Sequence, residues 1–247
     1  MNSNDMKEVD FSSSDIFISP KFAIRRMIGV GHKYGRLNAI KSSSFQQVRE
    51  CYIAGVFLLG LSHITKINYW LQPNSDPNNA PDVFAISIRN PKDKSEIGVV
   101  REVWKIEIFE YEDHSRDDLT THILKKVKDK RYGKDTVLVC FVHKSNILIN
   151  PEQLFNDLEK YRLEISEIWL LFQCDLFPNS DYVISKIFGD KACLVINFNH
   201  KQYPVQKDIL STRRAKSKTL KFEPKGEVIL RFPKLRGKVN DDKSTHN

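Results

Sequence analysis

The chain has 247 residues, of which 40% are hydrophobic and 28% are charged, a composition that suits a globular protein with a buried core. Its longest apolar run, at 53–61, is far shorter than the ~20 residues that a membrane-spanning helix needs. The polar, acidic N-terminus also lacks the apolar core of a signal peptide. We therefore expect a cytoplasmic protein, and the composition argues against a membrane protein.

Basic residues give the chain a formal net charge of +8 at pH 7, and they gather in particular places. Residues 21–41 contain no acid, residues 201–247 are strongly basic, and one predicted central helix carries a row of lysines. Such clusters favour a polyanionic partner. The alternative is a solvated surface that only keeps the protein soluble.

Two polar segments frame one predicted domain. Residues 1–18 lack a hydrophobic period and are expected to be disordered, as is a basic tail at 233–247. Residues 19–232 then form a single α/β domain. Its cysteines stand apart from each other inside apolar segments, without the spacing of metal ligands, and are predicted to be buried reduced thiols: Cys51, Cys140, Cys174 and Cys193.

The first elements come before the predicted centre of the domain. The glycine-rich segment 22–40 lacks the GK[ST] ending of a phosphate loop and is expected to be a turn with a basic surface. A helix is predicted over 45–62, with N-caps from the serines at 42–44 and an apolar second half that should be buried. Strands are expected at 64–71, 82–89 and 99–112.

The remaining elements extend the same sheet. A helix is predicted over 115–130 and a strand over 136–143, whose continuous apolar run is typical of a strand covered on both sides. Further on, the pattern predicts a helix and three strands, the last of them at a sheet edge: 151–161, 165–173, 192–198 and 226–232.

Acidic residues mark two neighbouring strands of this plan. Asp82 follows Pro81 at the start of one strand, and alternation places Lys105 and Glu107 on one face of the next. Glu50 lies on the same side of the preceding helix as Ile53, where a carboxylate is either a frayed surface group or part of a site. Carboxylates brought together in this way are the ligands that Mg²⁺ prefers.

The order helix, three strands, helix, strand over residues 43–144, with the Pro81-Asp82 pair and the acid-bearing strand, resembles the PD-(D/E)xK nuclease superfamily. The resemblance implies a restriction-endonuclease-like αβββαβ core with a mixed central sheet, here extended by a C-terminal helix and strands. It also implies a Mg²⁺-dependent nuclease, with Mn²⁺ as a substitute, that cleaves DNA in restriction or mobile-element defence. Asp82, Glu107 and Glu50 would then bind metal, and Asp82, Glu107 and Lys105 would be catalytic.

This chain departs from the motif at one position. The superfamily places a lysine two residues after the second acid, and Phe109 stands there, whereas Lys105 comes two residues before it. Glu110 and Glu112 form a further acid pair that alternates onto the opposite face. The alternative function is therefore a catalytically inactive nuclease-fold protein that binds nucleic acid or another protein.

The basic clusters supply the predicted nucleic-acid contacts. Lysines on the central helix and a basic group near the C-terminus are expected to border one positive surface that binds duplex DNA. Cutting both strands with one site per chain would call for a homodimer. The residues predicted to bind nucleic acid are Lys125, Lys126, Lys128, Lys130, Arg213, Arg214, Lys216 and Lys218.

Overall fold

The computed structural model describes residues 16–76, 80–89, 99–130, 132–143, 147–174, 181–190, 194–199, 206–211 and 227–230. The segments 1–15 and 231–247, the loop at 90–98 and the basic cluster at 213–218 lie outside the described residues. The elements, in chain order, are β1 (Ile16–Ile18), α1 (Pro20–Tyr34), α2 (Arg36–Lys41), the 3-10 turn η1 (Ser43–Phe45), α3 (Gln46–Thr65), β2 (Tyr69–Pro73), β3 (Val83–Arg89), β4 (Val99–Tyr111), α4 (Leu119–Asp129), β5 (Thr136–Val142), α5 (Pro151–Glu159), β6 (Glu167–Gln173), β7 (Asp181–Phe188), β8 (Leu194–Asn199), β9 (Ile209–Ser211) and β10 (Glu227–Leu230).

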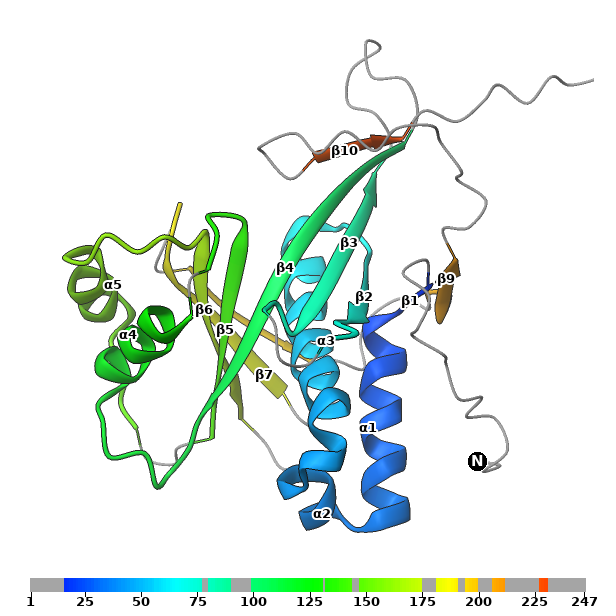
Figure 1. Cartoon of the computed structure of the whole chain (residues 1–247), viewed down its shortest axis with the longest axis horizontal. Helices are drawn as coiled ribbons and strands as arrows, with labels where there is room; N and C mark the ends of the chain where they lie inside the picture. Colours follow the sequence, from blue (N-terminus) through cyan, green and yellow to red (C-terminus); the bar gives the residue numbers. More distant parts are fainter. Residues whose placement is uncertain are drawn as a thin grey trace, which may run out of the picture.

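One mixed sheet organises the described chain, as the predicted α/β class requires. Its strands run in the order β8-β7-β6-β5-β4-β3-β2-β1-β9, and β10 pairs with the outer part of β4. The pairs β4–β5 and β5–β6 are parallel, whereas the other pairs are antiparallel. Figure 1 shows α1 and α3 on one side of the sheet and α4 and α5 on the other.

Each face of the sheet has its own hydrophobic core. Ile106 and Ile108 of β4 join the core under α1 and α3, while Phe109 and Tyr111 join the core under α4 and α5. The strand at the centre, β5, is buried along its whole length, which confirms the prediction from its continuous apolar sequence. The predicted order of helix, three strands, helix and strand corresponds to α3, β2, β3, β4, α4 and β5.

The segment 22–40 was wrongly predicted to be a turn, because it forms most of α1 and α2. Ser19 caps α1 by accepting a hydrogen bond from the Phe22 N–H, and Pro20 occupies the first turn. The helix packs on α3, so its glycines are held in a helical backbone by burial of one face. The chain breaks only at Gly35, whose φ of 88° lies in the left-handed region that favours glycine.

Other boundaries also differ from the predictions. The strand expected at 64–71 begins only at Tyr69, because α3 continues to Thr65 and ends with Lys66 in the left-handed conformation. The helix expected from Ser115 begins at Leu119, with Asp118 as its cap. β1 lies inside the segment 1–18 that was expected to be disordered, and β7 was not predicted.

The cysteines follow their prediction only in part. Cys51 and Cys140 are buried free thiols, and burial raises the pKa of Cys51 to about 12. Cys174, the residue after β6, is an exposed cysteine, so the expectation of burial was wrong there. Cys193 lies outside the described residues. Within the part of the chain that the structure describes, no helix has the length and apolar character to span a bilayer.

Candidate functional site

At the first residue of β3, the pairing between β3 and β4 ends and the two strands separate. Asp82, the first predicted site residue, lies at this point. Val83 pairs with Ile106, while β4 continues to Tyr111 with β5 alone as its paired strand. The same register places Asp82 opposite Glu107. Beyond the last backbone pair of β3 and β4, the Asp82 side chain bonds to β4 instead: its Oδ2 accepts a 2.7 Å hydrogen bond from the Ile108 N–H. Asp82 is therefore held by the backbone of the strand that carries Glu107.

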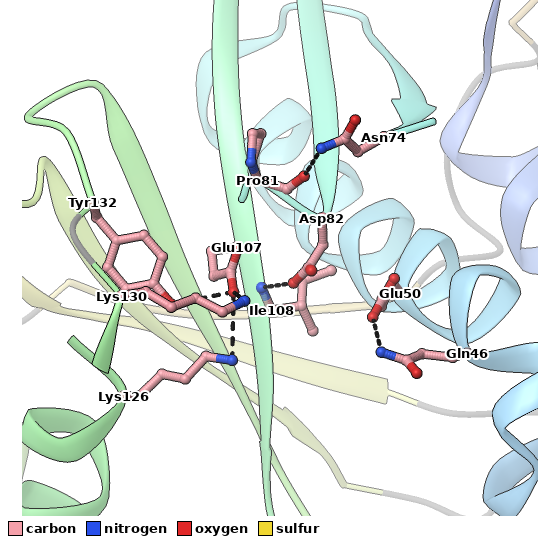
Figure 2. A network of polar contacts seen from close by, with 10 residues as sticks. All are labelled: Gln46, Glu50, Asn74, Pro81, Asp82, Glu107, Ile108, Lys126, Lys130 and Tyr132. Carbon is pink, nitrogen blue, oxygen red and sulfur yellow. Dashed lines mark hydrogen bonds and ion pairs between the residues drawn. The ribbon is translucent and has the colours of Figure 1, made fainter. Parts of the chain in front are cut away.

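Glu107 is fully buried, and one of its oxygens has several donors around it (Figure 2). Oε1 lies 2.5 Å from Lys130 Nζ and 3.4 Å from Lys126 Nζ, and it accepts a hydrogen bond of 3.1 Å from the Tyr132 hydroxyl. The second oxygen, Oε2, is buried and has no hydrogen-bond partner among the described residues. A buried carboxylate oxygen without a donor is costly, so this atom is where a bound group would be stabilised.

The electrostatics of Asp82 show that the two acids are close. Burial and then the charge of Glu107 raise the pKa of Asp82 to about 7, even though the hydrogen bond from Ile108 opposes the shift. Asp82 is therefore half protonated near neutral pH. Two acids that repel each other in this way would both ionise if a cation lay between them.

The charge of Glu107 also keeps the neighbouring Lys130 and Tyr132 protonated. Burial alone lowers the pKa of Lys130, but the hydrogen bond and charge of Glu107 outweigh it and raise this pKa. Burial and the charge of Glu107 also raise the pKa of Tyr132, so its hydroxyl stays protonated and donates. Lys130 thus remains an ammonium group directed at the acid pair.

Glu50 lies at the margin of this group. It is half-buried on α3, and its Oε1 accepts a 2.8 Å hydrogen bond from Gln46. Its charge contributes to the raised pKa of Asp82, and Figure 2 shows Asp82 between Glu50 and Glu107. Nevertheless, no three His, Cys, Asp or Glu side chains among the described residues are arranged to hold a metal ion. The acid pair is Asp82 and Glu107, with Glu50 beside it.

Lys105 does not take the place that its alternation suggested. Its ammonium group forms a 2.7 Å ion pair with Asp135, and its side chain is 42% exposed. Phe109, which occupies the usual lysine position, is buried under α4 and stacks on His122. The lysines directed at Glu107 come instead from α4 and the residue that follows it.

The four lysines of the central helix are divided among different partners. Lys126 and Lys130 face Glu107, as described above. Lys125 forms a 2.6 Å ion pair with Asp117, and Lys128 lies 5.8 Å from the centre of the Tyr161 ring. Arg213, Arg214, Lys216 and Lys218 lie outside the described residues. The described lysines therefore do not form one continuous strip.

Sequence reasoning assigned Lys130 to nucleic-acid binding and overlooked Tyr132. Two features of the sequence could have indicated these contacts. A Glu107 side chain that faces the core needs hydrogen-bond donors, and Lys126 and Lys130 are four residues apart, so they lie on the same face of a helix. Which of the nearby lysines reaches the acid depends on how α4 packs on the sheet. That packing cannot be read from spacing alone.

An apolar-walled pocket with a volume of about 540 Å³ lies elsewhere, between α1, α2, α3 and the ends of β5 and β6. Neither Asp82 nor Glu107 lines it or the open groove beside α4 and α5. Comparison of the chain with protein-family models, curated proteins and solved structures finds no match. The function is therefore inferred from the geometry of the site.

Proposed function

We propose that this chain is a Mg²⁺-dependent nuclease of the PD-(D/E)xK type that hydrolyses phosphodiester bonds in DNA. The observation that carries the proposal is the pairing of Asp82 with a buried Glu107, one of whose oxygens has no partner in the described part of the chain. The order α3, β2, β3, β4, α4, β5, with β4 antiparallel to β3 and parallel to β5, supports a restriction-endonuclease-like core.

The two carboxylates fit a magnesium ion. Mg²⁺ binds oxygen ligands, keeps several waters and is commonly held by one or two carboxylates together with substrate phosphates. A pair of acids where β3 and β4 separate therefore suffices, even without a third acidic side chain in reach among the described residues. Asp82 and Glu107 would hold the ion, whose positive charge would stabilise the charge that develops on the phosphate and lower the pKa of an attacking water.

The chain's own residues have separate tasks in this proposal. The Ile108 N–H fixes the Asp82 carboxylate, and Tyr132 and Lys126 fix that of Glu107. Lys130, whose pKa is raised, remains charged and orients the attacking water or the phosphate oxygens. We assign to Lys130 the task that the motif gives to a lysine two residues after the acid, and we leave Lys105 with Asp135.

The DNA partner of this proposal rests on charge. The net charge of +8 and the basic residues of α4 favour a polyanion, and duplex DNA is the partner that a nuclease of restriction or mobile-element defence requires. Binding through phosphates releases counterions, so affinity should fall linearly with salt on a log-log plot. A homodimer would place two such sites on the two strands.

A second function is favoured by one specific observation. Glu107 already has Lys130 and Lys126 against one oxygen, and these ammonium groups can supply the charge that a metal would bring. In that case the chain is an inactive nuclease-fold protein that binds nucleic acid or another protein. The two functions differ in whether a divalent cation binds at Asp82 and Glu107 while the lysines stay in place.

A cleavage assay tests the proposal. Supercoiled plasmid is incubated with the full chain and Mg²⁺, with Mn²⁺ in a parallel series and with chelator as the blank. We expect nicked or linear DNA only with metal, and none with Glu107→Gln. DNA binding without cleavage under either metal, with wild type and Glu107→Gln alike, would favour the inactive binding protein instead.

A further inference from the structure

The pocket of about 540 Å³ is distinct from the acid pair, because it opens on the α1 and α3 side of the sheet. His143 follows β5 and another of its residues, Gln173, ends β6, so it lies at the carboxyl ends of two parallel strands. Ligands of open α/β sheets bind at such ends. Its volume falls in the range of small-molecule sites, about 300 to 1,000 Å³.

The pocket combines cationic groups with apolar walls. The cationic or potentially cationic side chains are Arg36, Arg49, His32 and His143, and the walls include Met27 and Phe141. An aromatic ring and a thioether both make favourable contacts with flat ring systems. This lining suits a molecule with an anionic end and an apolar, ring-sized body.

Arg49 has an unused donor at the pocket. Its Nε donates a 2.9 Å hydrogen bond to Glu110 Oε1, and its side chain is only 17% exposed. Its Nη1 is buried and has no partner among the described residues. A buried guanidinium nitrogen without an acceptor is costly, and an anionic oxygen would satisfy it.

The charged side chains around the pocket favour a ligand with an anionic group. Glu110 neutralises Arg49 and also accepts a 2.6 Å hydrogen bond from His143. Burial by itself raises the pKa of Glu110, but the bonds from His143 and Arg49 outweigh it and hold this pKa below its usual range, so Glu110 is ionised. Arg36 adds a second guanidinium to the wall, and no Asp or Glu is among the described residues that line the pocket.

We propose that this pocket binds a phosphate monoester about the size of a mononucleotide, with the phosphate at Arg49 and the flat body between the helices and Phe141. Phosphate is favoured over carboxylate because it presents more oxygen acceptors to the Arg49 guanidinium and the other basic side chains of the wall. The proposal does not rest on nuclease activity, since it uses neither Asp82 nor Glu107.

Isothermal titration calorimetry of the full chain in chelator tests the pocket with four probes. Adenosine 5′-monophosphate should bind with a dissociation constant of about 100 µM or below, and adenosine and inorganic phosphate each about tenfold more weakly. Benzoate, which carries a carboxylate on a flat ring, should also bind more weakly. Tighter binding of benzoate would overturn the phosphate assignment, and no heat from the monophosphate up to roughly 5 mM would overturn the site.

Two variants localise the binding. Gly31 lines the pocket, and a Cβ added there meets nothing within 4 Å, so Gly31→Leu should fill the space without disturbing the fold. Leucine also favours the helix more than glycine does. Arg49→Met removes the guanidinium and should weaken binding about tenfold or more. Arg25→Met, which removes an exposed pair with Asp208 and a contact with the Phe22 ring outside the pocket, should leave binding unchanged. Wild-type affinity in Gly31→Leu would place the ligand elsewhere and overturn the proposal.

Discussion

Glu107, which is buried, and Glu110, which is half-buried, are acids of β4 on opposite faces of the strand, and their surroundings differ. Glu110 lies on the α3 side, and each of its oxygens has a nitrogen partner, Arg49 Nε at 2.9 Å and His143 Nε2 at 2.6 Å. Glu107 lies on the α4 side with Asp82 beside it, and among the described residues all its donors are at one oxygen while the other has none. A carboxylate with a partner at each oxygen, such as Glu110, stabilises the fold, whereas a buried carboxylate with donors at one oxygen indicates a binding site.

We expect the largest effect for the rate of DNA cleavage, which should depend on Glu107 and not on Glu110. Glu107→Gln keeps the shape of the side chain but removes the charge that would hold metal, so cleavage of plasmid DNA should fall by roughly 10³-fold or more. Glu110→Gln is the matched change on the other face and should alter the cleavage rate by less than about threefold. Equal losses in both variants, measured under the same Mg²⁺ concentration, would contradict the distinction.

The next effect separates two lysines. Lys130→Met should slow cleavage by about 10²-fold because its ammonium group lies against Glu107, while DNA binding should persist. Lys105→Met removes a lysine whose partner is Asp135 and should change the rate by less than about threefold. The measurement is single-turnover cleavage together with a binding titration. The assignment of Lys130 fails if the Lys105 variant is the slower enzyme.

A third effect concerns pH and stability without metal. The pKa of Asp82 is about 7 in the folded chain against an ordinary value of 3.8, so the folded state binds the proton more tightly. The stability from this group is fully present below about pH 4 and is lost as the pH rises through about 7. Relative to Asp82→Asn, which cannot ionise, wild type should lose about 2 kcal/mol of unfolding free energy between pH 5 and 8.

Urea unfolding in chelator measures this difference, with both proteins followed across the pH range. The asparagine can still accept the Ile108 hydrogen bond through its side-chain oxygen, which makes it a suitable reference. If the two proteins keep a constant difference in unfolding free energy from pH 5 to 8, burial and the charge of Glu107 do not raise the pKa of Asp82 as described.

The smallest effect concerns the paired acid as a structural element. Glu110→Gln leaves the Arg49 guanidinium buried without its counter-charge, which should destabilise the fold by about 2 kcal/mol. Thermal unfolding should show a lower midpoint for this variant than for wild type. An unchanged midpoint would mean that the contacts of Glu110 add nothing to stability.

The sequence predicted the strands that carry the acids better than the groups that surround them. Alternation along β4 placed Glu107 on one face, and the register of β3 and β4 brings Asp82 opposite it. Lys130 and Tyr132 follow α4, so their approach to Glu107 depends on the angle at which that helix crosses the sheet. Tertiary packing sets that angle, and a single sequence does not reveal it.

Two wrong predictions of secondary structure have similar causes. Glycines at 29, 31 and 35 suggested a turn, but burial of α1 on α3 outweighs their low helix propensity until Gly35. Ile64 and Thr65 are β-branched and suggested a strand, yet they continue the apolar helix α3 to its end. In both places, local preference gave way to packing against the rest of the domain.

In the proposed function, Asp82 and Glu107 together bind a divalent cation, and a calorimetric titration with Mn²⁺ measures this binding. Wild type at pH 8, where Asp82 is mostly ionised, should bind about one or two ions per chain. Asp82→Ala should lose this binding, while Glu110→Gln should retain it. Binding of Mn²⁺ that is equally tight in wild type and Asp82→Ala, or absent from wild type, would contradict the account.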